Sequence, residues 1–278
     1  MTSRLFALLA PMLWAGAALA QAPLSAGPVV YALDATEARQ GVASDGTHAY
    51  AIDNSRIGKY ELAGKTRIAG WEGEAALFPH MNACTLVDRR LYCAASNFPK
   101  VPMTSAIEIF DPAAMKHLST ISLGMGHGSL TWVSRRGGFW WAGFANYDGR
   151  GGEPGRDHRY TMVVKFDDQW REVGGYALPE AVLDRMAPMS TSGGAWGDDD
   201  LLYVTGHDRP ELYALRVPKS GSVLELVATI AIPFEGQAID WDPKTKRLLW
   251  GISRKDRKAI AVTIPPVTIP KVDANVAR

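Results

Sequence analysis

Residues 129–142, SLTWVSRRGGFWWA, decide the fold that we expect for this chain of 278 residues. They read as a short apolar strand, a turn rich in arginine and glycine, and a second strand rich in aromatic residues. The same pattern recurs in residues 40–52, 82–94, 193–204 and 237–251. Sequence repeats of roughly 40 to 50 residues are typical of the four-stranded blades of a β-propeller.

Further strands follow each of the five units. Third strands are expected at residues 57–62, 106–110, 160–166, 211–217 and 258–264, and most units continue into a fourth. The fifth unit lacks a fourth strand, but Val29 to Leu33 forms a spare strand before the first unit and can close the ring. We therefore predict an all-β, five-bladed β-propeller closed by an N-terminal strand. A six-bladed ring with one degenerate blade, or an open sandwich, is the alternative.

The two ends of the chain differ from this repeat. Arg4 precedes an apolar run from Leu5 to Leu19, and small residues end at Ala20, which is the order of a secretory signal peptide. The alternative is a membrane anchor, but the run is short and contains Pro11. We expect a signal peptide over residues 1–20, one propeller domain over 21–264 and a Pro-rich tail over 265–278. The mature protein is then periplasmic or secreted.

Charge and cysteine content narrow the class of partner. The chain has 30 Lys and Arg against 29 Asp and Glu, which gives no footprint for nucleic acid or an anionic membrane. If Asp88 and Arg89 form a two-residue turn, Cys84 lies directly opposite Cys93, and an oxidising compartment permits a cross-strand disulfide. Two small buried thiols are the alternative. No activating partner for a thiol nucleophile is evident.

One face of the propeller is expected to carry the ligand site. The loops that enter first strands and those that leave second strands open on the same face, and they are rich in polar residues. The opposite face carries ordinary turns, which turn propensity explains. The candidate substrate-binding residues on the polar face are Gln40, Asn54, Asn82, Asn97, Asn146, Arg150, Arg159, His207, Gln237 and Arg254.

His80, His127 and Asp148 are the candidate catalytic residues on this face. The two histidines begin adjacent blades, and imidazole titrates near neutral pH, so they suit an acid and a base with Asp148 as a charge partner. They are also the candidate ligands for one divalent metal ion at the channel mouth. The tight spacing of a motif such as HExxH is absent, so solvated rim residues are the alternative.

The longest loop of the face runs from Asn146 to Arg159. It contains three arginines among several glycines, and guanidinium groups bind carboxylate or phosphate in a bidentate way. A small polar or anionic molecule is the expected partner. The glycines lack the pattern of a P-loop or dinucleotide motif. A flexible, solvated insertion is the alternative.

Two phrases carry a resemblance to known families. Residues 39–42, RQGV, and 235–238, EGQA, are similar to blade phrases of bacterial glutaminyl cyclotransferases and of periplasmic lactonase-like, or cycloisomerase, propellers. The resemblance extends over about residues 40 to 254 but fails in the middle blades, so no catalytic residue is carried over. It implies the propeller fold and a cyclase, lyase or lactonase type of enzyme. A non-catalytic binding or scaffold protein is the alternative.

Overall fold

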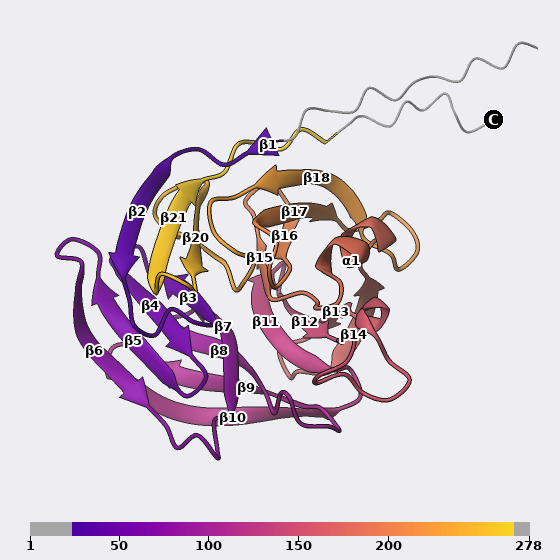
Figure 1. Cartoon of the computed structure of the whole chain (residues 1–278), viewed down its shortest axis with the longest axis horizontal. Helices are drawn as coiled ribbons and strands as arrows, with labels where there is room; N and C mark the ends of the chain where they lie inside the picture. Colours follow the sequence, from indigo (N-terminus) through magenta and orange to yellow (C-terminus); the bar gives the residue numbers. More distant parts are fainter. Residues whose placement is uncertain (1–23, 270–278) are drawn as a thin grey trace, which may run out of the picture.

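The computed structural model describes residues 24–269, in which five sheets surround a central axis (Figure 1). The predicted five-bladed β-propeller is confirmed. The strands, from the axis outward in each blade, are β3 (Gly41–Ser44), β4 (His48–Asp53), β5 (Arg56–Glu61) and β6 (Thr66–Glu72) in blade 1; β7 (His80–Val87), β8 (Arg90–Ser96), β9 (Thr104–Asp111) and β10 (Lys116–Met125) in blade 2; β11 (Ser129–Arg136), β12 (Phe139–Ala145), β13 (Met162–Phe166) and β14 (Glu172–Ala177) in blade 3; β15 (Gly193–Trp196), β16 (Leu202–Thr205), β17 (Glu211–Arg216) and β18 (Glu225–Ala231) in blade 4; and β19 (Asp240–Trp241), β20 (Leu248–Ser253), β21 (Lys258–Thr263) and β2 (Val29–Asp34) in blade 5.

Strand β2 closes the ring, as the sequence predicted. It pairs antiparallel with β21, with Ala32 opposite Ile260 and Leu33 opposite Ala259. Leu33 is its one buried side chain after the exposed Val29 and Val30. It joins a core cluster that includes Val42 of blade 1 and Trp250 of blade 5. One side chain therefore links the first blade to the last.

A two-residue strand, β1 (Leu24–Ser25), extends the closure further than the sequence indicated. It pairs in parallel with the outer strand of blade 4, with Leu24 opposite Ile230. The chain then crosses to blade 5 and enters β2 (Figure 1). The N-terminal segment thus spans the outer edges of two neighbouring blades. The signal peptide predicted for residues 1–20 lies outside the described residues.

Large aromatic side chains fill the space between blades. Trp132 on β11 is fully buried, and its indole Nε1 donates a hydrogen bond to Thr191 Oγ1 at 2.9 Å. A Cβ atom placed on Gly143 or Gly194 would lie 2.1 or 2.4 Å from this indole. Glycine in β12 and in the next blade's β15 therefore makes room for one tryptophan between two sheets.

The cysteine prediction is confirmed. Asp88 and Arg89 both have positive φ, as a two-residue hairpin turn requires, and Val87 faces Arg90. Cys84 and Cys93 are register partners and form a disulfide, with their Cα atoms 4.0 Å apart. Both are buried, so the bond lies inside blade 2.

Irregularities in two innermost strands direct side chains toward the channel mouth. The register of β7 shifts between Met81 and Cys84, and that of β11 shifts between Leu130 and Trp132. Such bulges leave a residue outside the ladder and change its direction. Asn82 and Thr131 lie at these shifts, and both line the cavity described below.

Helical structure is sparse, as the repeat predicted. The short helix expected at Pro179 to Met186 is present as α1 (Glu180–Met186). A 3₁₀ helix, η1 (His158–Tyr160), takes the first residue of the strand expected at 160–166, and β13 begins at Met162. No helix in residues 24–269 has the length and apolar character needed to cross a membrane.

We expect Leu33→Ala to destabilise the protein by about 2–5 kcal/mol, because it opens a cavity where the first and last blades meet. Val30→Ala, at an exposed position of the same strand, is the matched control and should change stability by less than about 0.5 kcal/mol. Urea unfolding followed by tryptophan fluorescence measures both. Equal effects of the two substitutions would show that β2 does not close the core.

Candidate functional site

A cavity of about 430 Å³ lies at the mouth of the channel, where loops from all five blades converge. This volume suits a small molecule. The lining residues are Arg39, Gln40, Asn54, Pro79, His80, Asn82, Phe98, Pro99, Thr131, Tyr147, Arg150, Met189, Ser192, His207, Gln237 and Arg254.

A chain of hydrogen bonds fixes His80 at the start of β7. Asn54 Oδ1 lies 2.9 Å from Gln40 Nε2 and 2.8 Å from His80 Nδ1. An amide oxygen only accepts, so His80 Nδ1 carries a proton and donates it to this bond. Nε2 is then an acceptor in the neutral ring, and no protein group in residues 24–269 pairs with it. Burial lowers the His80 pKa to about 4, with nearby Arg254 and His207 adding to the effect, so the ring is neutral at pH 7.

His207 is held in a matching way on the opposite side of the mouth. Arg254 Nη1 donates to His207 Nε2 at 2.9 Å, and His207 Nδ1 lies 2.5 Å from Asp208 Oδ1. A guanidinium only donates, so the ring accepts at Nε2 and donates at Nδ1. Gln237 Nε2 donates to the His207 carbonyl at 2.9 Å. The loop after β16 and the entry to β19 are thereby joined.

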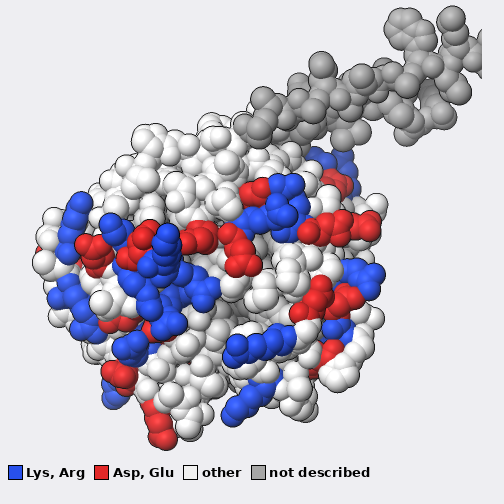
Figure 2. Space-filling model, in the orientation of Figure 1, with Lys and Arg blue, Asp and Glu red and all other residues white. Residues whose placement is uncertain are grey.

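The charges of the cavity are of one sign. Arg39, Arg150 and Arg254 line it, and no Asp or Glu does so in the described part of the chain. Arg39 reaches Asp53 at 3.7 Å, but Asp53 is already bound more closely by Arg56 at 2.7 Å. On the face seen in Figure 2, Lys and Arg side chains gather over the blade of β3 to β6.

Arg254 is the least compensated of the three arginines. Its side chain is about half buried, and burial lowers its pKa, although a guanidinium stays charged at any physiological pH. Within residues 24–269 it has no carboxylate at ion-pair distance, and its one side-chain hydrogen bond goes to the neutral His207. A partly desolvated cation without a paired anion favours an anionic ligand.

Most of the predicted binding residues converge on this cavity. They come from loops in all parts of the chain, as expected if first-strand entries and second-strand exits share a face. The predicted residues that line it are Gln40, Asn54, His80, Asn82, Arg150, His207, Gln237 and Arg254.

The other candidates lie outside the cavity and make structural contacts. His127 Nε2 lies 3.2 Å from Glu172, and the ring packs on Phe144 at 5.0 Å. The structure therefore does not bring His80 and His127 together as acid and base or as metal ligands. Asn146 is fully buried and donates to the carbonyls of His127 and Tyr160, while Asn97 bonds Pro102 and Thr104 within its own loop.

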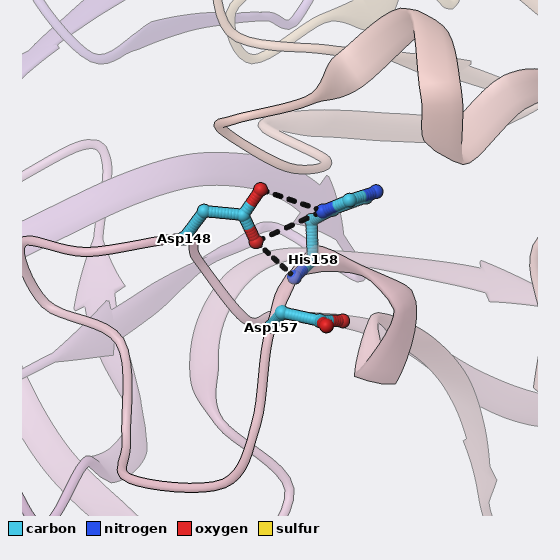
Figure 3. Close-up of side chains that lie close together, drawn as sticks. All are labelled: Asp148, Asp157 and His158. Carbon is cyan, nitrogen blue, oxygen red and sulfur yellow. Dashed lines mark hydrogen bonds and ion pairs between the residues drawn. The ribbon is translucent and has the colours of Figure 1, made fainter.

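Asp148 and Arg159 stabilise the long loop after β12. Asp148 accepts hydrogen bonds from the backbone N–H and Nδ1 of His158, at 2.9 and 2.8 Å (Figure 3). Asp157 caps η1 and binds Arg159. Asp148, Asp157 and His158 could each offer an atom to one cation. The internal contacts already account for their positions, and we assign no metal to them.

Sequence analysis missed part of the lining. Arg39 directly precedes Gln40, and its position at the same strand entry could have identified it. Phe98 and Met189 were missed because an apolar residue in a loop gives no signal of binding. Tyr147 and Ser192 lie on the predicted face but were not chosen as site residues.

Comparisons with known proteins support the fold. No family model matches the chain, and no curated protein matches its sequence. A luciferin-regenerating enzyme is 11% identical, with a TM-score of 0.51 over 85% of this chain and 94% of that chain. Hydrazine synthase of Kuenenia stuttgartiensis is 12% identical, with a TM-score of 0.48 over 82% of this chain and 71% of that chain. Identities this low show the β-propeller fold alone.

We expect Asn54→Asp to raise the His80 pKa by roughly 1 to 3 pH units, because a carboxylate beside Nδ1 stabilises the imidazolium. NMR titration of the His80 ring measures the change. Asn97→Asp, which introduces the same charge outside the cavity, should leave the His80 pKa unchanged. An unaltered pKa in Asn54→Asp would contradict the hydrogen bond that we describe.

Proposed function

We propose that the mouth cavity binds a small organic anion. The observation that carries this proposal is the lining itself, which has three arginines and no acidic side chain within residues 24–269. Charges in a concave site are screened less than charges on an open surface, so the cavity attracts anions. Since the whole chain has a formal net charge of only +1, the positive character is local to this site.

Arg254 is the main anion-binding group in this proposal. His207 orients its guanidinium from one side, which leaves further N–H donors for a carboxylate or phosphate. Arg39 and Arg150 add charge at the rim. Ser192 and Gln237 supply polar groups at the entries of β15 and β19.

Replacement of Arg254 by Gln should weaken the binding of acetate and phosphate by about tenfold or more, since a charge-assisted hydrogen bond is lost. Arg209→Gln is the matched control, because Arg209 is exposed in the same loop as His207 and does not line the cavity. Calorimetry and the thermal shift caused by each anion measure binding. Equal binding by the parent and both variants would refute the anion site.

A second candidate function is hydrolysis or cyclisation of the bound molecule, in keeping with the resemblance to cyclotransferase and lactonase-like propellers. His80 favours it, because a neutral imidazole with an unpaired Nε2 lines the same cavity as the arginines. A bound anion would raise the low His80 pKa and make the ring a better base. A luciferin-regenerating enzyme with this fold shows by its name that such propellers can be catalysts. Non-catalytic ligand binding is the alternative.

Lactone hydrolysis illustrates the chemistry that this arrangement allows. His80 Nε2 takes a proton from water, and the hydroxide adds to the carbonyl carbon while Arg254 stabilises the developing oxyanion. The ring C–O bond then breaks, and the leaving alkoxide recovers the proton from His80. The product is a hydroxy acid, whose carboxylate suits the same arginines.

If this second candidate is right, His80→Gln should lower the hydrolysis rate of five- and six-membered lactones by at least about 100-fold. The control is His127→Gln, which removes a histidine outside the cavity and should keep the parent rate. A pH-stat assay over a panel of lactones measures both. Parent-like turnover in His80→Gln would remove the catalytic role, and an inactive parent would leave ligand binding as the function.

We also propose that the protein is exported to the periplasm or secreted. The disulfide between Cys84 and Cys93 supports this, since such bonds persist in oxidising compartments. The order of charged, apolar and small residues at the N-terminus supports it independently.

A further inference from the structure

The cavity has two chemically different walls. Blades 4, 5 and 1 contribute the polar wall, where His207, Arg254 and Arg39 lie. The loops of blades 2 and 3 contribute Phe98, with Pro99 beside it, and Tyr147. The bound molecule therefore meets cationic groups on one side and ring faces on the other.

The aromatic wall is a packed structure. The Phe98 ring lies 5.0 Å from the Tyr147 ring at 61° and 5.1 Å from the His80 ring at 35°. Phe98 and Met189 both pack against the buried cluster of Met103, Ala145 and Tyr147. Burial raises the Tyr147 pKa to about 12, so its phenol stays neutral. These contacts hold the Phe98 ring in place at the cavity.

The long loop after β12 supports the same wall. Glu153 Oε1 accepts a hydrogen bond from the Met103 backbone N–H at 2.6 Å, which ties this loop to the Phe98 loop. Gly151 has a φ of +79°, and a Cβ there would lie 2.2 Å from the Phe98 ring. Glycine at this position lets the backbone lie directly on the phenylalanine.

We propose, building on the anion site above, that the ligand is a small carboxylate bearing a ring. Its carboxylate faces Arg254 and Arg39, and its ring lies against Phe98 and Tyr147. A ring in this place covers apolar surface that an inorganic anion leaves in contact with water, and aromatic pairs at such distances attract one another. The cavity of about 430 Å³ limits the molecule to a small one.

Benzoate, acetate and benzyl alcohol are the probes that separate the two walls. Benzoate and acetate share the carboxylate, whereas benzoate and benzyl alcohol share the ring. We expect the parent protein to bind benzoate at least about tenfold more tightly than either of the others, as measured by protein-observed NMR titration.

Two substitutions of Phe98 test the position of the ring. In Phe98→Leu and Phe98→Ala the preference for benzoate over acetate should fall about 5- to 10-fold, while acetate affinity stays within twofold of the parent. Phe98→Leu retains apolar volume, so it remains informative if Phe98→Ala fails to fold. Leu118→Ala, at an exposed position on β10, is the control and should preserve the preference.

The outcomes distinguish this inference from the proposal on which it rests. Equal affinities for benzoate and acetate in the parent, or an unchanged preference in Phe98→Leu, would overturn the ring-bearing ligand and leave the anion site. Benzyl alcohol bound as tightly as benzoate would overturn the role of the carboxylate. If neither benzoate nor acetate bound, both proposals would be overturned.

Discussion

The pairing of β2 with β21 is the constraint on which the cavity depends. It brings the start of the chain to the last blade, so that Arg39 and Gln40 enter blade 1 beside residues that lie some two hundred positions later. The Ala238 N–H donates to the Gln40 carbonyl at 3.3 Å, which links the entries of blades 5 and 1. Without closure, the polar wall of the cavity would be divided between two free ends.

Glu37 locks the segment that connects β2 to blade 1. Its carboxylate is buried and accepts hydrogen bonds from the Tyr60 hydroxyl at 2.6 Å and from Arg67 Nε at 3.0 Å. These bonds outweigh the effect of burial and keep the Glu37 pKa below its ordinary value, so the group is ionised at neutral pH. The position of Arg39 thus follows from a charged, fully bonded anchor two residues earlier.

The positive character of the cavity arises from how charges are distributed rather than from how many there are. Elsewhere arginines are matched with carboxylates, as in Arg67 with Glu37, Arg185 with Glu211 and Arg247 with Asp199. Arg254 bonds a neutral histidine instead. An anion-binding site can therefore exist in a chain of nearly zero net charge, and composition alone does not reveal it.

Sequence reasoning succeeded where strand periodicity fixes position. The blade repeat placed Gln40, His80 and Gln237 at one rim, because each stands at or just before a first strand. It failed where a side chain's direction depends on loop conformation. His127 stands between Gly126 and Gly128, which both have a φ of +118°, and this backbone directs the ring to Glu172.

The same limit applies within the long loop after β12. Asp148 and Arg150 are two residues apart, yet Arg150 lines the cavity while Asp148 bonds His158. No periodic pattern distinguishes them. Phe98 escaped notice because its role comes from packing against Tyr147, which lies in the next blade. Contacts between loops of different blades are tertiary, so a single sequence does not specify them locally.

The most direct test of the account is a crystal structure of the protein grown in sodium acetate. We predict a carboxylate bound at the channel mouth, within hydrogen-bonding distance of the Arg254 guanidinium, with His207 still accepting from Nη1. A structure in which Arg254 turns away to pair with a protein carboxylate such as Asp208 or Glu235, and the mouth holds no anion, would contradict it.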